Sequence, residues 1–352
     1  MNKMNKKIKI YYGCQTQYQN LGDLIINRLC LSEIRKRADV KCLTFGVPNY
    51  FLAGLELKDG ESIESSFTFY IKLILDLVRG NDVVIWGKPG HIIHNKLSFR
   101  MLPSLIVKCL LRLLKARFVR IGSTFGPFNG LPLKVEKYCY NKGFLGVRDI
   151  NSLIFCKKIN FPNVDYCPDI ALLSPYLNND KKNNVIAFSF RANSTDLNSE
   201  VQGISQCLRG ASSCGFDLTP VVQVSLDNQF MKKISDELSI CSSFKQYPNN
   251  DEEEIFEIYK NSRIVVSNRL HVLIFAMSMG AIPIPIIDPA KNKKVAGVFT
   301  QIGLTELIFE LNSISSFEDH LSVILNRVYD FEKIYQNSKV EISQVFDRII
   351  HD

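Results

Sequence analysis

Short apolar runs alternate along the chain with longer stretches in which apolar residues recur at helical spacing. A short run between turn-forming residues predicts a buried strand, and a longer periodic stretch predicts a helix. The predicted strands are 8–13, 40–46, 82–87, 118–122, 143–147, 185–190, 218–224, 264–266 and 281–287. The predicted helices are 24–37, 67–78, 97–118, 197–209, 230–240, 251–260, 270–279 and 315–350. This alternation predicts an α/β protein with parallel sheets.

The clearest part of this pattern lies between residues 264 and 287. An apolar strand meets a polar turn at 267–271, and an apolar helix then ends at Gly280 before a second apolar strand. This order predicts a parallel strand–helix–strand unit, with Gly280 in the left-handed C-cap conformation. Ligands of such sheets bind beyond the carboxyl ends of the strands. We therefore expect Arg269 and His271 beside a helix N-terminus, where free N–H groups favour an anion.

Chain length and one polar segment predict two domains. The 352 residues exceed one ordinary hydrophobic core. Residues 174–184 are rich in turn formers and form the predicted linker. The expected ranges are a first domain at 1–174, a second at 185–314, and a C-terminal helical segment at 315–352 that crosses back over the first domain. Two α/β domains facing each other across a cleft are the expected architecture.

Composition narrows the class of protein. Hydrophobic residues make up 46% and charged residues 22% of the chain, as in a soluble globular protein. The N-terminal segment lacks the apolar region of a signal peptide, and no stretch reaches the ~18 apolar residues of a spanning helix. We therefore expect a cytoplasmic protein. The net charge of +8 is spread along the chain, which argues against a nucleic-acid-binding tail and favours anionic substrates or an anionic membrane surface.

Cysteine and histidine spacing gives no sign of a metal centre. The ten cysteines form no CxxC pair and are expected to be reduced, mostly buried thiols. The histidines show no zinc-ligand spacing with them. His91 and His94 are close enough to share a metal, but nothing else in the sequence supports such a site. No metal and no cofactor are expected.

Further polar residues follow other predicted strands. Asn20, Gly22 and Asp23 lie between the first strand and the next helix, where they form either a helix cap or a loop that holds substrate. Arg148 follows strand 143–147, either as a strand-end cation or in an ion pair with Asp149 or Asp169. Arg191 follows strand 185–190. Lys291, Lys293 and Lys294 would add positive charge beside Arg269 and His271.

Several short motifs, weak singly, occur in an order and spacing that resemble one family. They are residues 20–23, 122–128, 147–149 with Ser152, 169–171, 267–271 and 294–297. In these segments the chain resembles the polysaccharide pyruvyl transferase family. It departs from the family at 87–90, where Gly-Lys-Pro-Gly replaces a more glycine-rich strand end.

The resemblance implies a fold and an activity. The fold is two Rossmann-like domains of GT-B type, the first on the acceptor side and the second on the donor side. The activity is that of a transferase in bacterial surface polysaccharide biosynthesis, of capsule, O-antigen or exopolysaccharide. It moves a pyruvyl group from phosphoenolpyruvate, the co-substrate, to a sugar and forms a cyclic ketal. The alternatives are a GT-B-type glycosyltransferase with a nucleotide-sugar donor and a non-catalytic scaffold of glycan assembly.

This chemistry assigns expected roles. Phosphoenolpyruvate carries a phosphate and a carboxylate, which the planar fork of arginine binds well. Histidine is the side chain best suited to exchange a proton at neutral pH, so His271 is the candidate for proton transfer to carbon 3. The predicted catalytic residues are His271, Arg269 and Asp23. The predicted substrate-binding residues are Asn20, Gly22, Arg148, Arg191, Asn268 and Lys294.

A basic helical face has two interpretations. Lys108, Arg112 and Lys115 lie on one side of the predicted helix 97–118. The face is either an ordinary solvated surface or a docking surface for anionic lipid at the inner face of the cytoplasmic membrane. The second interpretation suits an enzyme whose glycan acceptor is linked to a lipid.

Overall fold

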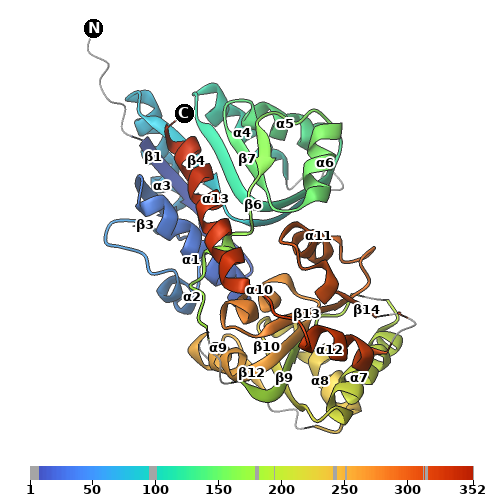
Figure 1. Ribbon diagram of the computed structural model, residues 1–352. Helices are drawn as coiled ribbons and strands as arrows, with labels where there is room; N and C mark the ends of the chain where they lie inside the picture. Colours follow the sequence, from blue (N-terminus) through green and yellow to red (C-terminus); the bar gives the residue numbers. More distant parts are fainter. Residues whose placement is uncertain are drawn as a thin grey trace. The chain divides into compact units, whose positions relative to one another are not determined.

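The computed structural model describes residues 8–94, 101–178, 182–193, 195–240, 244–249, 252–311, 313 and 316–351. The chain forms two compact units (Figure 1). The first contains Asp23–Ile170, residues up to Tyr18 and residues from Lys339 onward. The second contains Gln19–Gly22 and Ala171–Ser338.

The first unit is a parallel sheet in the order β3-β2-β1-β4-β6-β7-β8, with β5 paired to β6. Its strands are β1 (Ile8–Gly13), β2 (Asp39–Leu43), β3 (Ser62–Ile63), β4 (Asp82–Gly87), β5 (Gly90–His94), β6 (Arg117–Phe128), β7 (Phe144–Val147) and β8 (Val164–Tyr166). Its helices are α1 (Leu21–Arg35), α2 (Asn49–Gly54), α3 (Ser66–Val78), α4 (Leu102–Leu113), α5 (Gly130–Tyr140) and α6 (Ile150–Lys158). A short helical turn, Ile170–Leu173, leads into the second unit.

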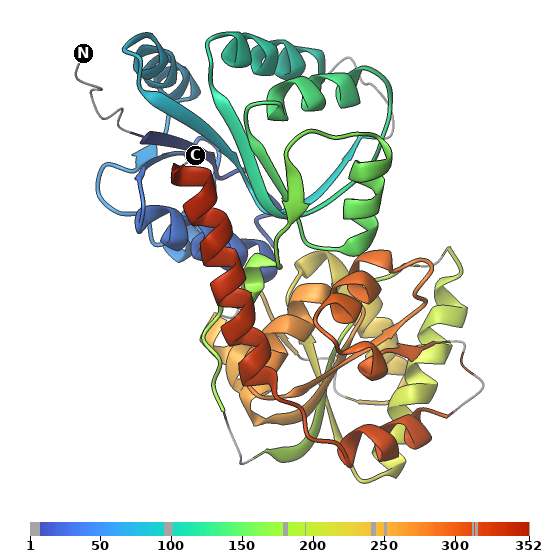
Figure 2. The same cartoon turned by 45° about the horizontal axis from the view of Figure 1, so that its top comes forward.

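The second unit is also a parallel sheet, in the order β11-β10-β9-β12-β13-β14. Its strands are β9 (Asn183–Ser189), β10 (Asp217–Val222), β11 (Lys245–Gln246), β12 (Ser262–Ser267), β13 (Ile282–Ile287) and β14 (Phe309–Glu310). Its helices are α7 (Leu197–Ser213), α8 (Asn228–Glu237), α9 (Glu252–Asn261), α10 (Leu270–Ser278), α11 (Lys293–Gln301) and α12 (Phe317–Leu325). Helices lie on both faces of each sheet (Figure 2).

Helix α13 (Phe331–His351) is shared by the two units. Its residues up to Ser338 cluster with the second unit and those from Lys339 with the first, as expected for a C-terminal segment that returns to the first domain. Inside the first unit, the ring of Phe346 stacks on Trp86 with 5.2 Å between ring centroids. The ring contact fixes the last turns of the chain to the first sheet.

Two glycines show how local sequence determines these elements. Gly280 has φ +78°, the left-handed conformation that ends α10, as predicted. Gly143 precedes β7, and a Cβ atom there would lie 1.8 Å from the carbonyl oxygen of Phe118. Only glycine allows β6 and β7 to approach this closely at that point.

The α/β class with two parallel sheets is confirmed, and several predicted bounds are corrected. The predicted helix 315–350 is two helices, α12 and α13, separated at Asn326–Asp330. The predicted helix 97–118 is the shorter α4, and residues 97–100 of it lie outside the described residues. Strand 118–122 extends into the long β6. Residues 19–22, expected in the first domain, cluster with the second unit.

Candidate functional site

The strand order of the second sheet locates a candidate site. Strands β9 and β12 are neighbours at the centre of the sheet, while β10 and β13 lie outside them on opposite sides. This is the topological switch point of a doubly wound sheet, where ligands bind beyond the carboxyl ends of the strands. The polar turn 267–271 follows β12 at this point, and Arg191 lies just beyond the end of β9.

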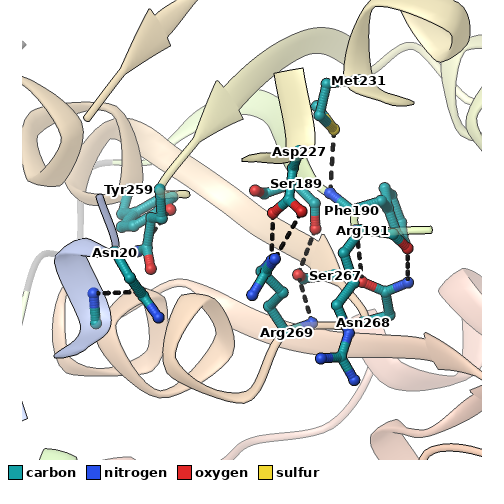
Figure 3. A network of polar contacts seen from close by, with 12 residues as sticks. Asn20, Ser189, Phe190, Arg191, Asp227, Met231, Tyr259, Ser267, Asn268 and Arg269 are labelled. Carbon is teal, nitrogen blue, oxygen red and sulfur yellow. Dashed lines mark hydrogen bonds and ion pairs between the residues drawn. The ribbon is translucent and has the colours of Figure 1, made fainter. Parts of the chain in front are cut away.

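Ser267 and Asn268 join the ends of β9 and β12 (Figure 3). The Ser267 hydroxyl donates to the carbonyl oxygen of Ser189 and accepts from the backbone N–H of Arg269 at 2.9 Å. The Asn268 side chain accepts from the backbone N–H of Arg191 at 2.9 Å and donates to its carbonyl oxygen at 2.7 Å. Both polar groups of Asn268 therefore hold the Arg191 backbone, so Asn268 positions Arg191.

Arg269 forms a two-point ion pair with Asp227, which follows β10 (Figure 3). Its Nη2 donates to Oδ1 of Asp227 at 2.6 Å, and its Nε donates to Oδ2. Burial raises the pKa of Asp227, and the adjacent Arg269 partly offsets that rise. Asp227 is 5% exposed and fixes the Arg269 fork in one orientation. Sequence reasoning did not place Asp227 in the site, although an acid just after a strand end was a usable signal.

Arg191 contributes a half-buried side chain whose Nε atom is buried. The contacts in Figure 3 involve its backbone, and its Nε has no hydrogen-bond partner among the described residues. Burial, and then the charge of Arg269, lower the pKa of Arg191. An arginine at the end of a strand whose N–H groups are not all hydrogen-bonded within the protein is suited to bind an anion.

His271 lies in the first turn of α10, against the segment Gln19–Gly22. The backbone N–H of Leu21 donates to the carbonyl oxygen of Gln223 at 3.0 Å, which anchors the segment beside the end of β10. The side-chain oxygen of Asn20 accepts from the N–H of Gly22 at 3.0 Å. A Cβ atom at Gly22 would lie 2.7 Å from Nδ1 of His271. The structure thus brings Asn20, Gly22 and His271 together.

The predicted residues of the first unit have contacts of their own. Arg148 is 1% exposed; it pairs with Asp169 and donates to the hydroxyl of Thr124 at 3.1 Å. Of the two roles the sequence allowed, this geometry matches the structural ion pair. Asp23, in the first turn of α1, accepts from the hydroxyl of Thr16 at 2.5 Å.

Two cations beside the end of β4, Arg120 of the neighbouring β6 and Lys88, escaped the predicted set. Arg120 packs on Gly87, where a Cβ atom would lie 2.5 Å from Nε of Arg120. This Nε is buried and has no hydrogen-bond partner among the described residues. Burial also lowers the pKa of Lys88, the residue after β4. A strand arginine opposite a glycine was the signal available in the sequence.

The remaining predicted positions add less. Lys294 is the second residue of α11 and is half-buried. The side chain of His94 lies outside the described residues, so its proposed partnership with His91 is untested. In the described part of the chain, no three His, Cys, Asp or Glu residues are grouped as metal ligands. Nor does any helix described there combine the length and apolar character needed to cross a membrane.

The family model for polysaccharide pyruvyl transferase matches residues 20–286. The chain belongs to this family. The matched range begins at Asn20 and ends in β13, so it contains the whole network from Arg191 to His271. No curated protein sequence matches the chain.

Solved structures with the GT-B fold resemble this pyruvyl transferase family member along nearly its whole length. The UDP-GlcNAc 2-epimerase of Methanocaldococcus jannaschii is 11% identical with a TM-score of 0.59, over 98% of this chain and 100% of that one. The UDP-GlcNAc 2-epimerase of Neisseria meningitidis, bound to UDP-GlcNAc, is 11% identical with a TM-score of 0.56, over 98% and 99%. The E. coli trehalose-6-phosphate structure bound with UDP-2-fluoro glucose is 10% identical with a TM-score of 0.52, over 97% and 96%. At these identities the likeness establishes the fold.

Proposed function

We propose that the protein transfers a pyruvyl group from phosphoenolpyruvate to a sugar and forms a cyclic ketal during polysaccharide biosynthesis. The observation that carries this proposal is the family match, because it spans the complete polar network at the switch point of the second sheet. That network combines two arginines, a helix N-terminus and a histidine, which suits a small substrate with two anionic groups.

The proposed donor substrate, phosphoenolpyruvate, would bind through its phosphate and carboxylate groups. Arg191 offers the guanidinium whose Nε has no partner among the described residues, and Asn268 fixes its backbone. Asp227 orients Arg269 and accepts hydrogen bonds from its Nε and Nη2. The donor substrate would therefore contact the remaining nitrogen of the guanidinium, Nη1. Backbone N–H groups in the first turn of α10 would supply further donors to phosphate or carboxylate.

The reaction needs one proton delivered and two hydroxyl protons removed. In the proposed sequence His271 protonates carbon 3 of the enol, which gives carbon 2 cationic character. One sugar hydroxyl then adds to carbon 2, and a second displaces phosphate by breaking the bond between carbon 2 and the phosphate oxygen. One hydroxyl proton restores the protonated imidazole, and the other leaves with phosphate. Asp23 is the proposed acceptor-side base, which takes this second hydroxyl proton and passes it to the departing phosphate.

A glycosyltransferase with a nucleotide-sugar donor is the alternative. Two of the similar structures are bound with UDP-GlcNAc and UDP-2-fluoro glucose. In this chain the same arginines and helix N-terminus would then hold the donor diphosphate. The two proposals differ in the anion bound, so ligand binding separates them.

Thermal unfolding with phosphoenolpyruvate, UDP, GDP or CMP tests the donor. We expect phosphoenolpyruvate to raise Tm, since a ligand at about 100 times its Kd adds about 2.7 kcal/mol to the free energy of unfolding. Arg191→Ala should abolish the rise, and Arg209→Ala, an exposed arginine paired with Glu237, should retain it. A rise with a nucleotide and none with phosphoenolpyruvate would favour the glycosyltransferase.

A further inference from the structure

Helix α3 of the first unit is apolar on its buried face and on its exposed face. Phe69 and Leu73 are buried in the core of the unit. The exposed apolar side chains recur three or four residues apart and are Phe67, Tyr70, Ile71, Ile74, Leu75 and Val78. Phe67 and Val78 are 75% and 73% exposed. A surface helix normally presents polar residues to water, so this face is an exception.

Helix α4 repeats the pattern. Its buried Leu105 and Leu111 join the same core cluster as Phe69 and Leu73 of α3. Its exposed apolar residues, with its C-cap, are Ile106, Val107, Leu110, Leu113 and Leu114. Because both helices pack on the same core cluster, we call the two sets together the α3–α4 surface. It holds 11 of the 22 large apolar side chains that are exposed in the described part of the chain, and such concentration marks an interaction site.

The exposed charges in these helices and within two residues of their C-terminal ends have one sign. Lys72, Arg79 and Lys115 are exposed. Asp76 is the only acid in α3, and it accepts from the hydroxyl of Tyr11 at 2.8 Å; α4 has no acid. The surface is therefore apolar with cations on and after its helices, while the exposed acid Glu64 precedes the N-cap of α3.

The basic face predicted from the sequence differs in part from this surface. Lys108 pairs with the buried carboxylate of Glu136, and Arg112 lies over the ring of Tyr138, 5.7 Å from its centroid. Lys115 is the exposed member of the predicted trio. The apolar residues between these cations form the outward face that sequence reasoning overlooked.

A cavity of about 960 Å³ opens at the C-terminal end of α4. Two ion pairs, Arg117 with Asp82 and Arg348 with Asp165, line it at the amino-terminal edge of the sheet. Arg112, Lys115 and Lys142 add three more cations to the lining, so cations exceed carboxylates there. The Nε of Arg112 is buried and has no hydrogen-bond partner among the described residues. A cationic cavity that shares Arg112 and Lys115 with an apolar helix is suited to an anionic headgroup whose acyl chains meet the apolar residues.

We propose that the α3–α4 surface docks on a bilayer of anionic phospholipid, with apolar side chains in the acyl boundary and Lys72, Arg79 and Lys115 among the headgroups. A second copy of the chain fits poorly, because an isologous contact would bring the same cations against each other. Neutral lipid would leave these cations and the cavity without counter-charge. The inference does not depend on which group the enzyme transfers.

Flotation of the full chain with vesicles tests this proposal without any activity assay. We expect binding to vesicles of phosphatidylethanolamine with phosphatidylglycerol and little binding to phosphatidylcholine. Phe67→Ser/Val78→Ser and Lys72→Glu/Arg79→Glu should each lower the bound fraction by about tenfold or more. The matched controls in the second unit, Val323→Ser/Val328→Ser and Lys232→Glu/Lys233→Glu, should bind like wild type, with the same change in charge.

Three results would overturn the proposal. The first is that the wild-type protein does not bind the anionic vesicles. The second is that the matched control variants lose as much binding as the surface variants. The third is that the wild-type protein binds phosphatidylcholine vesicles as well as anionic ones. Size-exclusion chromatography with light scattering decides about a second copy: a dimer that Phe67→Ser/Val78→Ser dissociates would assign the surface to self-association instead. Circular dichroism of each variant establishes that lost binding is not lost folding.

Discussion

Each sheet carries an arginine–carboxylate pair beyond its strand ends, and the two pairs differ in exposure. In the first unit, the Arg148 and Asp169 side chains are both 1% exposed. In the second unit, the Arg269 side chain is 18% exposed and that of Asp227 is 6% exposed. Arg148 directly follows β7, and Arg269 is the second residue after β12. Position in the sequence therefore does not show which arginine is structural and which can bind substrate.

The difference teaches how to separate a structural cation from one that a substrate can reach. Arg148 also donates to Thr124 of β6 and is enclosed, so it joins β6 to the segments after β7 and β8. Arg269 lies next to Arg191, whose Nε has no partner in the described part of the chain, and two residues before His271. We therefore propose that the second pair takes part in substrate binding and that the first stabilises the fold.

The largest expected effect tests the chemistry at the second pair. His271→Ala should lower pyruvyl transfer by about 10²–10⁴-fold, the usual contribution of a general acid or base. The free energy of unfolding should change little, because the imidazole ring of His271 is only half-buried. Phosphate release and ketal formation on a sugar acceptor measure the loss. His91→Ala, an exposed histidine of the first unit, is the matched control.

Two outcomes would contradict the proposal that the chemistry depends on the second unit and not on the first. Wild-type turnover by folded His271→Ala would exclude the proposed proton transfer. An equal loss in His91→Ala would place essential chemistry in the first unit as well, and His91 with His94 would again become a candidate pair.

The next largest effect concerns stability. Arg148→Leu and Arg269→Leu each leave a buried carboxylate without its partner, which costs about 3–5 kcal/mol of unfolding free energy. The double variants Arg148→Leu/Asp169→Leu and Arg269→Leu/Asp227→Leu should regain most of that, because apolar pairs often replace buried ion pairs well. Only the first double variant should also regain transfer. Denaturant unfolding and the transfer assay measure the two quantities.

The double variants decide whether each ion pair is structural or takes part in function. If Arg269→Leu/Asp227→Leu recovers activity along with stability, the second pair is as structural as the first. If Arg148→Leu/Asp169→Leu is stable but inactive, Arg148 takes part in function despite its enclosure.

Much of the fold could be predicted because burial imposes periodicity. Strand β4 and the start of α7 were predicted to the residue, and the unit from β12 to β13 was predicted with its Gly280 cap. Helix α5 was missed because it mixes charged and apolar residues without a clear stripe. Edge strands β3, β11 and β14 are two residues each, too short for periodicity to detect.

The candidate site could be predicted only in part. Strand-end position correctly brought Arg191, Asn268, Arg269 and His271 to one edge of a sheet. The pairing of Arg269 with Asp227 joins residues 42 positions apart, and no local pattern encodes such a contact. For the same reason the sequence could not show that Asn268 serves the backbone of Arg191, or that Gly22 lies against His271.

The smallest expected effect tests that last contact. A Cβ atom at Gly22 would lie 2.7 Å from Nδ1 and 2.9 Å from Cβ of His271, closer than real side chains pack. Gly22→Ala should therefore displace the imidazole and lower transfer by about ten- to a hundredfold, the cost of a misplaced reacting group. Gly13→Ala is the control, because its new methyl group would meet only Oε1 of Gln15, at 3.4 Å. In a His271→Ala background, Gly22→Ala should cost nothing further, because both changes act through one side chain. An additive loss there would mean that Gly22 serves the substrate directly, and the role of the segment Gln19–Gly22 would be binding rather than support of His271.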